Sequence, residues 1–174
     1  MNVTLIGMPG SGKTFVGKIL AETLGFEFFD SDIAIEQEYG RTLPEILQNL
    51  GPRRFLQKEK KAVIANTRGK DKLVISPGGS IVYSEKAMEH LKTISAIVYL
   101  KTALPVIKER IGSVPRGIVG GGKKTIARLF GERSPLYEKW AETTVDANQN
   151  AVKVVHDILE KIQHIKKITN PTAN

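Results

Sequence analysis

The segment GMPGSGKT, residues 7–14, constrains the fold of this chain more than any other. It fits G-x-x-x-x-G-K-[ST] at every fixed position and lies between an apolar run, residues 2–6, and an amphipathic stretch, residues 13–24. A strand, a glycine loop and a helix in this order predict a phosphate-binding loop, where backbone N–H groups and a helix N-terminus surround phosphate oxygens. A chance glycine turn is the alternative, and the flanking strand and helix argue against it. The sequence therefore predicts a site for ATP or GTP.

Five residues of this loop are candidate nucleotide ligands. Gly10, Ser11 and Gly12 would supply the turn and the backbone donors, because glycine lets the chain curl closely around an anion. Lys13 would reach the β- and γ-phosphates, and the hydroxyl of Thr14 would ligate Mg²⁺.

Strands and helices alternate along the remaining chain, which predicts an α/β fold with a parallel sheet covered on both faces. One domain is expected over residues 1–165, and residues 166–174 are expected to be a frayed tail. The predicted strands are residues 2–6, 26–29, 72–76, 96–100 and 143–145. The predicted helices are residues 13–24, 33–39, 44–50, a new helix from Pro52, 85–91, 104–111 and 152–165.

Composition limits the function classes. The net charge of +8 favours anionic partners, but aromatic residues are only 6% and do not interleave with the basic ones, which argues against a nucleic-acid surface. No apolar run approaches the roughly 18 residues that span a bilayer, and the N-terminus lacks the pattern of a signal peptide. The absence of cysteine excludes disulfides and thiolate metal sites, so a cytoplasmic location is expected.

Two further segments place polar groups at the carboxyl ends of predicted strands, where open parallel sheets bind ligands. In FFDSD, Asp30 and Asp32 alternate, so their carboxylates point to one side of an extended chain. One acid near Mg²⁺ and one near an acceptor hydroxyl would suit phosphoryl transfer, whereas the structural alternative is a pair that caps the next helix. The second segment, SPGGS at residues 76–80, is a glycine turn after a strand.

A glycine-rich stretch at residues 111–125 interrupts the pattern of strands and helices. It holds five glycines and three basic residues, which indicates either a lid, residues 112–124, or a disordered insertion. Arg110, Arg116 and Arg133 are spread from the helix before this stretch to the helix beyond it. An arginine on a mobile loop can close over a transferring phosphoryl group, although a single arginine is more often a solvated surface charge.

Together these motifs resemble the shikimate kinase family of P-loop kinases over nearly the whole chain. The resemblance rests on the phosphate loop, FFDSD, GPRRFLQKE (residues 51–59), SPGGS, RGIV (residues 116–119) and ERSPLYEKWA (residues 132–141). It implies five parallel strands in the order 2-3-1-4-5, a flexible lid and substrate-binding helices at about residues 33–62. It also implies Mg²⁺-dependent transfer of phosphate from ATP to shikimate, giving shikimate 3-phosphate for aromatic amino acid biosynthesis.

The resemblance implies a role for each matching residue. Catalysis would fall to Lys13, Asp32 and Arg116, and Arg110 would lie near the adenine. The residues implied around the metal are Thr14, Asp30 and Ser76. The residues implied around the acceptor are Asp32, Gly78, Gly79, Ser80 and Arg133.

The chain departs from the family pattern around the acceptor. In GPRRFLQKE, Pro52 replaces a glutamate and Leu56 replaces an arginine that grips the carboxylate of shikimate. Away from the acceptor, the adenine-side loop near Asn148 is shorter. Ser80 stands for a third glycine and Gly117 for the lid proline. We hypothesise that Arg53, three residues before Leu56 on the same helical face, takes over the carboxylate while Leu56 makes an apolar contact.

Two rival functions stay open on the sequence alone. The same machinery could phosphorylate another polyol or a hydroxy acid, as a gluconate-type kinase does. The chain could instead be a nucleotide-binding module without catalysis. In the preferred reading we expect a monomer that binds ATP and a small acceptor, with no nucleic-acid or membrane partner.

Overall fold

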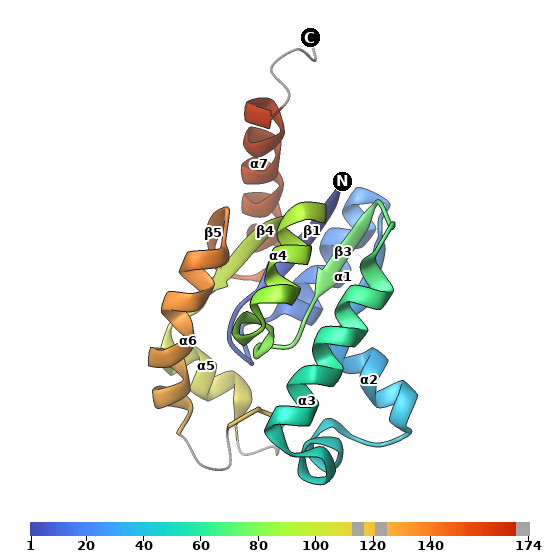
Figure 1. The fold of residues 1–174 in the computed structure, drawn as a ribbon. Helices are drawn as coiled ribbons and strands as arrows, with labels where there is room; N and C mark the ends of the chain where they lie inside the picture. The colour runs from blue at the N-terminus through green and yellow to red at the C-terminus, as the bar shows by residue number, and fades with distance from the viewer. Residues whose placement is uncertain (113–116, 121–124, 170–174) are drawn as a thin grey trace.

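Five parallel strands form the centre of the molecule (Figure 1). The computed structural model describes residues 1–112, 117–120 and 125–169. The sheet order is β2-β3-β1-β4-β5, so the order implied by the sequence resemblance is confirmed. The strands are β1 (Asn2–Ile6), β2 (Glu27–Asp30), β3 (Leu73–Ser76), β4 (Ser95–Lys101) and β5 (Thr143–Asp146).

The connections between the strands are helical, as a parallel sheet requires. The helices are α1 (Lys13–Leu24), α2 (Ser31–Tyr39), α3 (Leu43–Thr67), α4 (Glu85–Ile94), α5 (Leu104–Ile111), α6 (Ile126–Trp140) and α7 (Ala151–Thr169), with one 3₁₀ turn, η1 (Ile81–Tyr83). Within α3, Gly51 has φ 72° and ψ 163°, which is not helical, and Pro52 follows it. The predicted break between two helical stretches is therefore confirmed.

Side chains of the strands alternate between two apolar layers. On β3, Leu73 and Ile75 face the layer beneath α4 and α6, whereas Val74 faces the layer beneath α1 and α7. On β4, Ile97 and Val98 alternate in the same way. Because both faces of a parallel sheet are covered, the strands are almost continuously hydrophobic, which is why the sequence revealed them.

A third apolar cluster lies beside the sheet and joins α2, α3 and residues 117–120. We call it the α2–α3 cluster. It brings the two helices that the sequence assigned to substrate binding into contact with described residues of the predicted lid. Its buried members are Ile35, Ile46, Phe55 and Val119, and the partly buried Leu43, Leu47, Leu50, Leu56 and Ala62 pack against them.

Several predicted boundaries differ from those in the structure by a few residues, and α4, for example, ends at Ile94 rather than at residue 91. Helix α2 begins at Ser31 rather than at residue 33, because the Asp30 carboxylate caps it and accepts hydrogen bonds from the backbone N–H groups of Asp32 (3.0 Å) and Ile33 (3.4 Å). Helix α7 continues to Thr169, so the tail expected to fray from residue 166 is helical at its start. Residues 170–174 lie outside the described part of the chain. No helix in the described ranges is long and apolar enough to cross a membrane.

Candidate active site

The loop between β1 and α1 curls around the amino group of Lys13. Gly12 has φ 92° and directly precedes α1, a conformation that favours glycine. Lys13 is buried, and its Nζ donates to the backbone oxygens of Gly7 (2.9 Å) and Met8 (3.1 Å). Burial lowers the pKa of Lys13 to about 8, while the nearby Asp32 acts in the opposite direction. The amino group is thus held at the place where phosphate oxygens would bind.

Three oxygen-bearing side chains, which the sequence assigned to a metal site, lie beside this loop. Thr14 Oγ1 donates a 2.8 Å hydrogen bond to Asp30 Oδ2. Asp30 ends β2 and is the register partner of Ser76 on β3. Hydroxyl and carboxylate oxygens are ligands that fit Mg²⁺, a hard cation. Asp30 also caps α2, so the capping role and the predicted metal-site position coexist in one residue.

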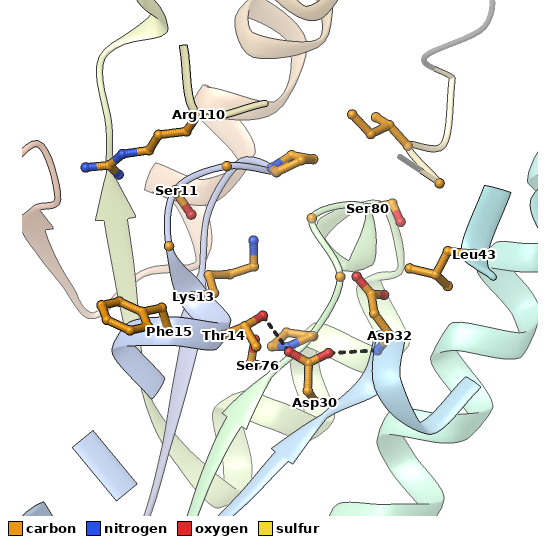
Figure 2. Close-up of a pocket in the computed structure, with 18 of the residues that line it drawn as sticks. Ser11, Lys13, Thr14, Phe15, Asp30, Asp32, Leu43, Ser76, Ser80 and Arg110 are labelled. Carbon is orange, nitrogen blue, oxygen red and sulfur yellow. Dashed lines mark hydrogen bonds between the residues drawn. The ribbon is translucent and has the colours of Figure 1, made fainter. Parts of the chain in front are cut away.

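Asp32 faces the same cavity from the first turn of α2, across from Lys13 (Figure 2). Burial, together with the carboxyl groups of Glu59 and Asp30, raises the pKa of Asp32 to about 8, while Lys13 acts in the opposite direction. Glu59, on α3, is fully buried, and its Oε2 accepts a 2.8 Å hydrogen bond from Ser80 Oγ. Burial also raises the pKa of Glu59, to about 7. Two carboxyl groups with raised affinity for protons therefore lie close together.

The turn after β3 fits tightly between these acids. The Gly78 N–H donates to Ser31 Oγ at 3.0 Å. A Cβ atom at Gly78 would lie 2.3 Å from Glu59 Oε1 and 2.7 Å from Asp32 Oδ1, distances that no real Cβ tolerates. Glycine is required at this position because both carboxyl groups approach its Cα.

Arg133 reaches the cavity from α6 and is almost completely buried. Its Nε donates to Tyr83 Oη at 3.2 Å and its Nη2 donates to the backbone oxygen of Val119 at 2.7 Å. One turn along α6, Tyr137 Oη donates to the backbone oxygen of Gly79 at 2.6 Å. Helix α6 thus holds the glycine turn and presents a guanidinium group to the cavity.

The opposite end of the cavity has the features of a nucleotide-base site. Arg110, on α5, lies above the phosphate loop, and its Nη1 donates to the backbone oxygen of Ala147 at 3.1 Å (Figure 2). Gln149 and Asn150 line this end, and the Phe15 ring is 66% exposed within it. Such a mixture of a cation, amides and an aromatic ring is suited to a planar, polar base.

One continuous cavity of about 1150 Å³ contains both ends. That volume accommodates a nucleotide and a small acceptor together. The predicted residues that line it are Gly10, Ser11, Gly12, Lys13, Thr14, Asp30, Asp32, Ser76, Gly78, Gly79, Ser80, Arg110 and Arg133.

The structure does not bring the predicted Arg53 and Leu56 into this cavity. Phe55 is the residue of that helix that lines it, and Arg53 lies two residues earlier, about 200° away around the helix. Arg53 is therefore exposed, while Leu56 is half-buried against the α2–α3 cluster. Arg116 lies outside the described residues.

Sequence reasoning gave no role to Glu59 and Phe55. Both occupy fixed positions of the family pattern G-E-x-x-F-R-x-x-E, so the signal was present in GPRRFLQKE. The sequence alone predicts an exposed side chain for Glu59, because an acid in a basic, amphipathic stretch normally faces solvent.

A phosphate loop, two acids at the carboxyl end of β2 and an opposing arginine in one cavity define the chain as a P-loop phosphotransferase that acts on small molecules. The comparisons with known proteins agree. The family model for shikimate kinase matches residues 9–163. The chain belongs to the shikimate kinase family, whose members are ATP-dependent phosphotransferases with an alcohol group as acceptor.

Relatives match over nearly their whole length. A shikimate kinase of Persephonella marina is 33% identical over 93% of this chain and 99% of its own length. One of Mycobacterium avium is 38% identical over 91% of each chain. The solved structure of the Acinetobacter baumannii shikimate kinase in complex with shikimate superimposes with a TM-score of 0.82 at 32% identity, covering 99% of this chain and 95% of that one. A gluconokinase from Sinorhizobium meliloti, with a TM-score of 0.56 at 18% identity, shares the fold alone.

Proposed function

We propose that this protein transfers the γ-phosphoryl group of ATP to a hydroxyl of shikimate, giving shikimate 3-phosphate and ADP for aromatic amino acid biosynthesis. The observation that carries the proposal is the convergence of Lys13, Asp32 and Arg133 on one cavity, from three separate elements. Similarity to shikimate kinases over almost the full chain supports shikimate as the acceptor.

In this mechanism the acceptor hydroxyl attacks the γ-phosphorus, and the bond from that phosphorus to the β,γ-bridging oxygen breaks. Asp32 Oδ would take the hydroxyl proton, which its raised pKa favours. Lys13 would stabilise charge on the β- and γ-phosphates, because its amino group is already fixed at the loop. Arg116 is proposed as the lid arginine on the basis of the family resemblance.

The metal is proposed to be Mg²⁺. Thr14 would ligate it, and Asp30 and Ser76 would lie in its outer shell, since their oxygens meet beside the phosphate loop. When bound, the ion would reduce the negative charge that the phosphate oxygens carry during transfer.

The acceptor is proposed to bind between Arg133 and the glycine turn. Arg133 would hold the carboxylate, and backbone N–H groups around Gly78, Gly79 and Ser80 would meet the ring substituents. Arg110 would lie against the adenine, as its place above the phosphate loop supports. We also propose that the protein is a monomer in the cytoplasm and has no nucleic-acid partner.

An ADP-release assay with shikimate, quinate, gluconate and simple polyols tests the acceptor. The proposal expects the highest kcat/KM with shikimate. A clear preference for gluconate or a polyol would contradict it and favour the rival kinase. Such a preference would have a physical reason: Leu56 supplies no guanidinium for the carboxylate of shikimate, and Arg53 does not line the cavity. Absence of single-turnover transfer to every acceptor would favour a module without catalysis.

A further inference from the structure

The buried carboxyl group of Glu59 is only partly satisfied. Its Oε2 accepts the 2.8 Å hydrogen bond from Ser80 Oγ. Its Oε1 lies against the Gly78 backbone and makes no hydrogen bond of normal geometry within the described ranges 1–112, 117–120 and 125–169. Because the side chain is fully buried, the hydrogen bonds that the protein supplies are important for its position. The hydrogen bond from the Ser80 hydroxyl is therefore a main contact that positions the Glu59 carboxyl group.

Two departures from the family pattern meet at this acid. Position 56 lies three residues before Glu59 on the same helix, so a long cationic side chain there could reach its carboxyl group. Leucine at that position has no donor and packs into the α2–α3 cluster. Ser80, in contrast, adds a donor where the family pattern has glycine. Position 56 of α3 therefore supplies no hydrogen-bond donor to Glu59, whereas Ser80, on the turn after β3, supplies one.

A displacement of the Glu59 carboxyl group would change the acceptor site directly. Its Oε1 and Asp32 Oδ1 approach the same point beside Gly78. Ser80 and Asp32 lie on the same side of the cavity, facing Lys13 (Figure 2). A change of Glu59 would therefore alter both the glycine turn and the carboxylate assigned to the acceptor hydroxyl.

We propose that the Ser80 hydroxyl is a specificity-determining, positioning group that anchors Glu59 and so compensates for leucine at position 56. Ser80 acts through Glu59 on the Gly78 turn and on Asp32, without touching the phosphate donor. This inference rests on the proposed function, because the turn and Asp32 are assigned there to the acceptor. The replacements at positions 80 and 56 then have one physical reason, which is that the buried Glu59 needs a hydrogen-bond donor.

The first test compares Ser80→Ala with the parent protein in steady-state kinetics. The loss of a donor to a buried acid predicts a rise in KM for shikimate of roughly tenfold, with KM for ATP changed less than about twofold. Ser95→Ala is the matched control, because Ser95 is a buried serine of β4 that donates to Leu91 O at 2.7 Å, away from the cavity. It is expected to reduce stability and to leave KM for shikimate unchanged.

The second test asks whether the effect runs through Glu59. Leu56→Arg introduced into Ser80→Ala should bring KM for shikimate back toward the parent value, because a guanidinium supplies the missing donor. In a Glu59→Gln background, Ser80→Ala should change KM much less than in the parent. Equal effects of Ser80→Ala in both backgrounds, or no rescue by Leu56→Arg, would overturn the inference.

The outcomes separate this inference from the proposed function. A parent that phosphorylates shikimate, with the same KM after Ser80→Ala, overturns only the role of Ser80. A parent that leaves shikimate unchanged but phosphorylates another acceptor overturns the proposed function and this inference with it. If Ser80→Ala fails to fold, Ser80→Gly provides the same comparison, since it removes the hydroxyl and restores the family residue.

Discussion

The nucleotide end and the acceptor end of the cavity are built in different ways. At the nucleotide end, the phosphates would meet one contiguous segment, the loop after β1 and the first turn of α1, which supplies backbone donors, Lys13 and Thr14. At the acceptor end, α2, α3, the turn after β3 and α6 each contribute one or two side chains. Ser80 and Gly117 depart from the family pattern at the acceptor end and Leu56 departs from it in the adjoining α2–α3 cluster, whereas the shorter loop near Asn148 lies at the nucleotide end.

This difference follows from what each end must recognise. A phosphate chain is bound mainly by main-chain N–H groups, so few sequences provide the required backbone path. An acceptor is held by side chains, and neighbouring positions can exchange roles when one of them changes. The acceptor end therefore tolerates replacements such as Leu56 and Ser80, provided that the buried Glu59 keeps a donor.

The strongest test of the nucleotide end is Lys13→Ala. Loss of the buried amino group should reduce kcat/KM by about 10³-fold or more, because charge on the transferring group is no longer stabilised. Circular dichroism should show an intact fold, since the Lys13 amino group donates to two backbone oxygens of its own loop. Lys18→Ala, on the exposed face of α1, is the control and should keep parent activity. Substantial activity of Lys13→Ala would break the assignment of the loop.

Asp32→Asn tests the point where the two ends meet. An amide cannot take the acceptor proton, so kcat should fall by about 10²- to 10⁴-fold. Glu38→Gln, exposed on the same helix, is the control. Rapid-quench measurement of the first turnover separates chemistry from product release. Near-full turnover by Asp32→Asn would show that another group takes the proton.

Arg133→Lys tests the acceptor end alone. Lysine keeps the charge but loses the fork of donors, so KM for shikimate should rise by roughly ten- to a hundredfold. KM for ATP should stay near the parent value. Arg128→Lys is the control, because Arg128 is exposed on the same helix and pairs with Glu132. Equal rises in KM for both substrates would contradict a division of the cavity into two ends.

The pH dependence of stability tests burial of Glu59. Its folded-state pKa, about 7, exceeds its ordinary value of 4.5, so this group favours the folded protein below pH 4.5, and that contribution is lost as pH rises through 7. The Glu59→Gln variant should not lose stability in this way, because an amide does not ionise. Relative to the variant, the parent should lose on the order of 1–3 kcal/mol of unfolding free energy over that range. Urea titrations at pH 5 and pH 8 measure it, and a constant difference would contradict the assignment.

The smallest effect is expected where residues 117–120 contact α3. A Cβ atom at Gly117 would lie 2.5 Å from Leu43 Cβ, so Gly117→Ala should cost on the order of 1 kcal/mol and raise KM for shikimate a few-fold. The backbone carbon of Leu43 would lie 2.7 Å from the same atom, so a smaller side chain at Leu43 should not restore KM. Gly131→Ala is the control, because open space surrounds that position in α6. An unchanged KM after Gly117→Ala would show that this contact does not affect the acceptor end.

The sequence by itself determined the sheet, the phosphate loop and most of the nucleotide end. Strands buried on both faces leave continuous apolar runs, and the loop is encoded by consecutive residues with glycine at its fixed positions. That Asp30 and Ser76 lie at one edge of the sheet followed from the carboxyl ends of parallel strands, whereas their place side by side was implied by the family resemblance. These features depend on local pattern, so the sequence reveals them.

Only the tertiary structure decided which side chains of α3 face the cavity. The break at Gly51 was predictable, but the rotation of the following helix depends on packing in the α2–α3 cluster, which turns Phe55 inward and Arg53 outward. Burial of Glu59 against Ser80 depends on the same rotation and on a turn that lies 21 residues further along the chain. Hydrophobic periodicity identifies a buried face but not its partner, because that partner is fixed by contacts between distant segments.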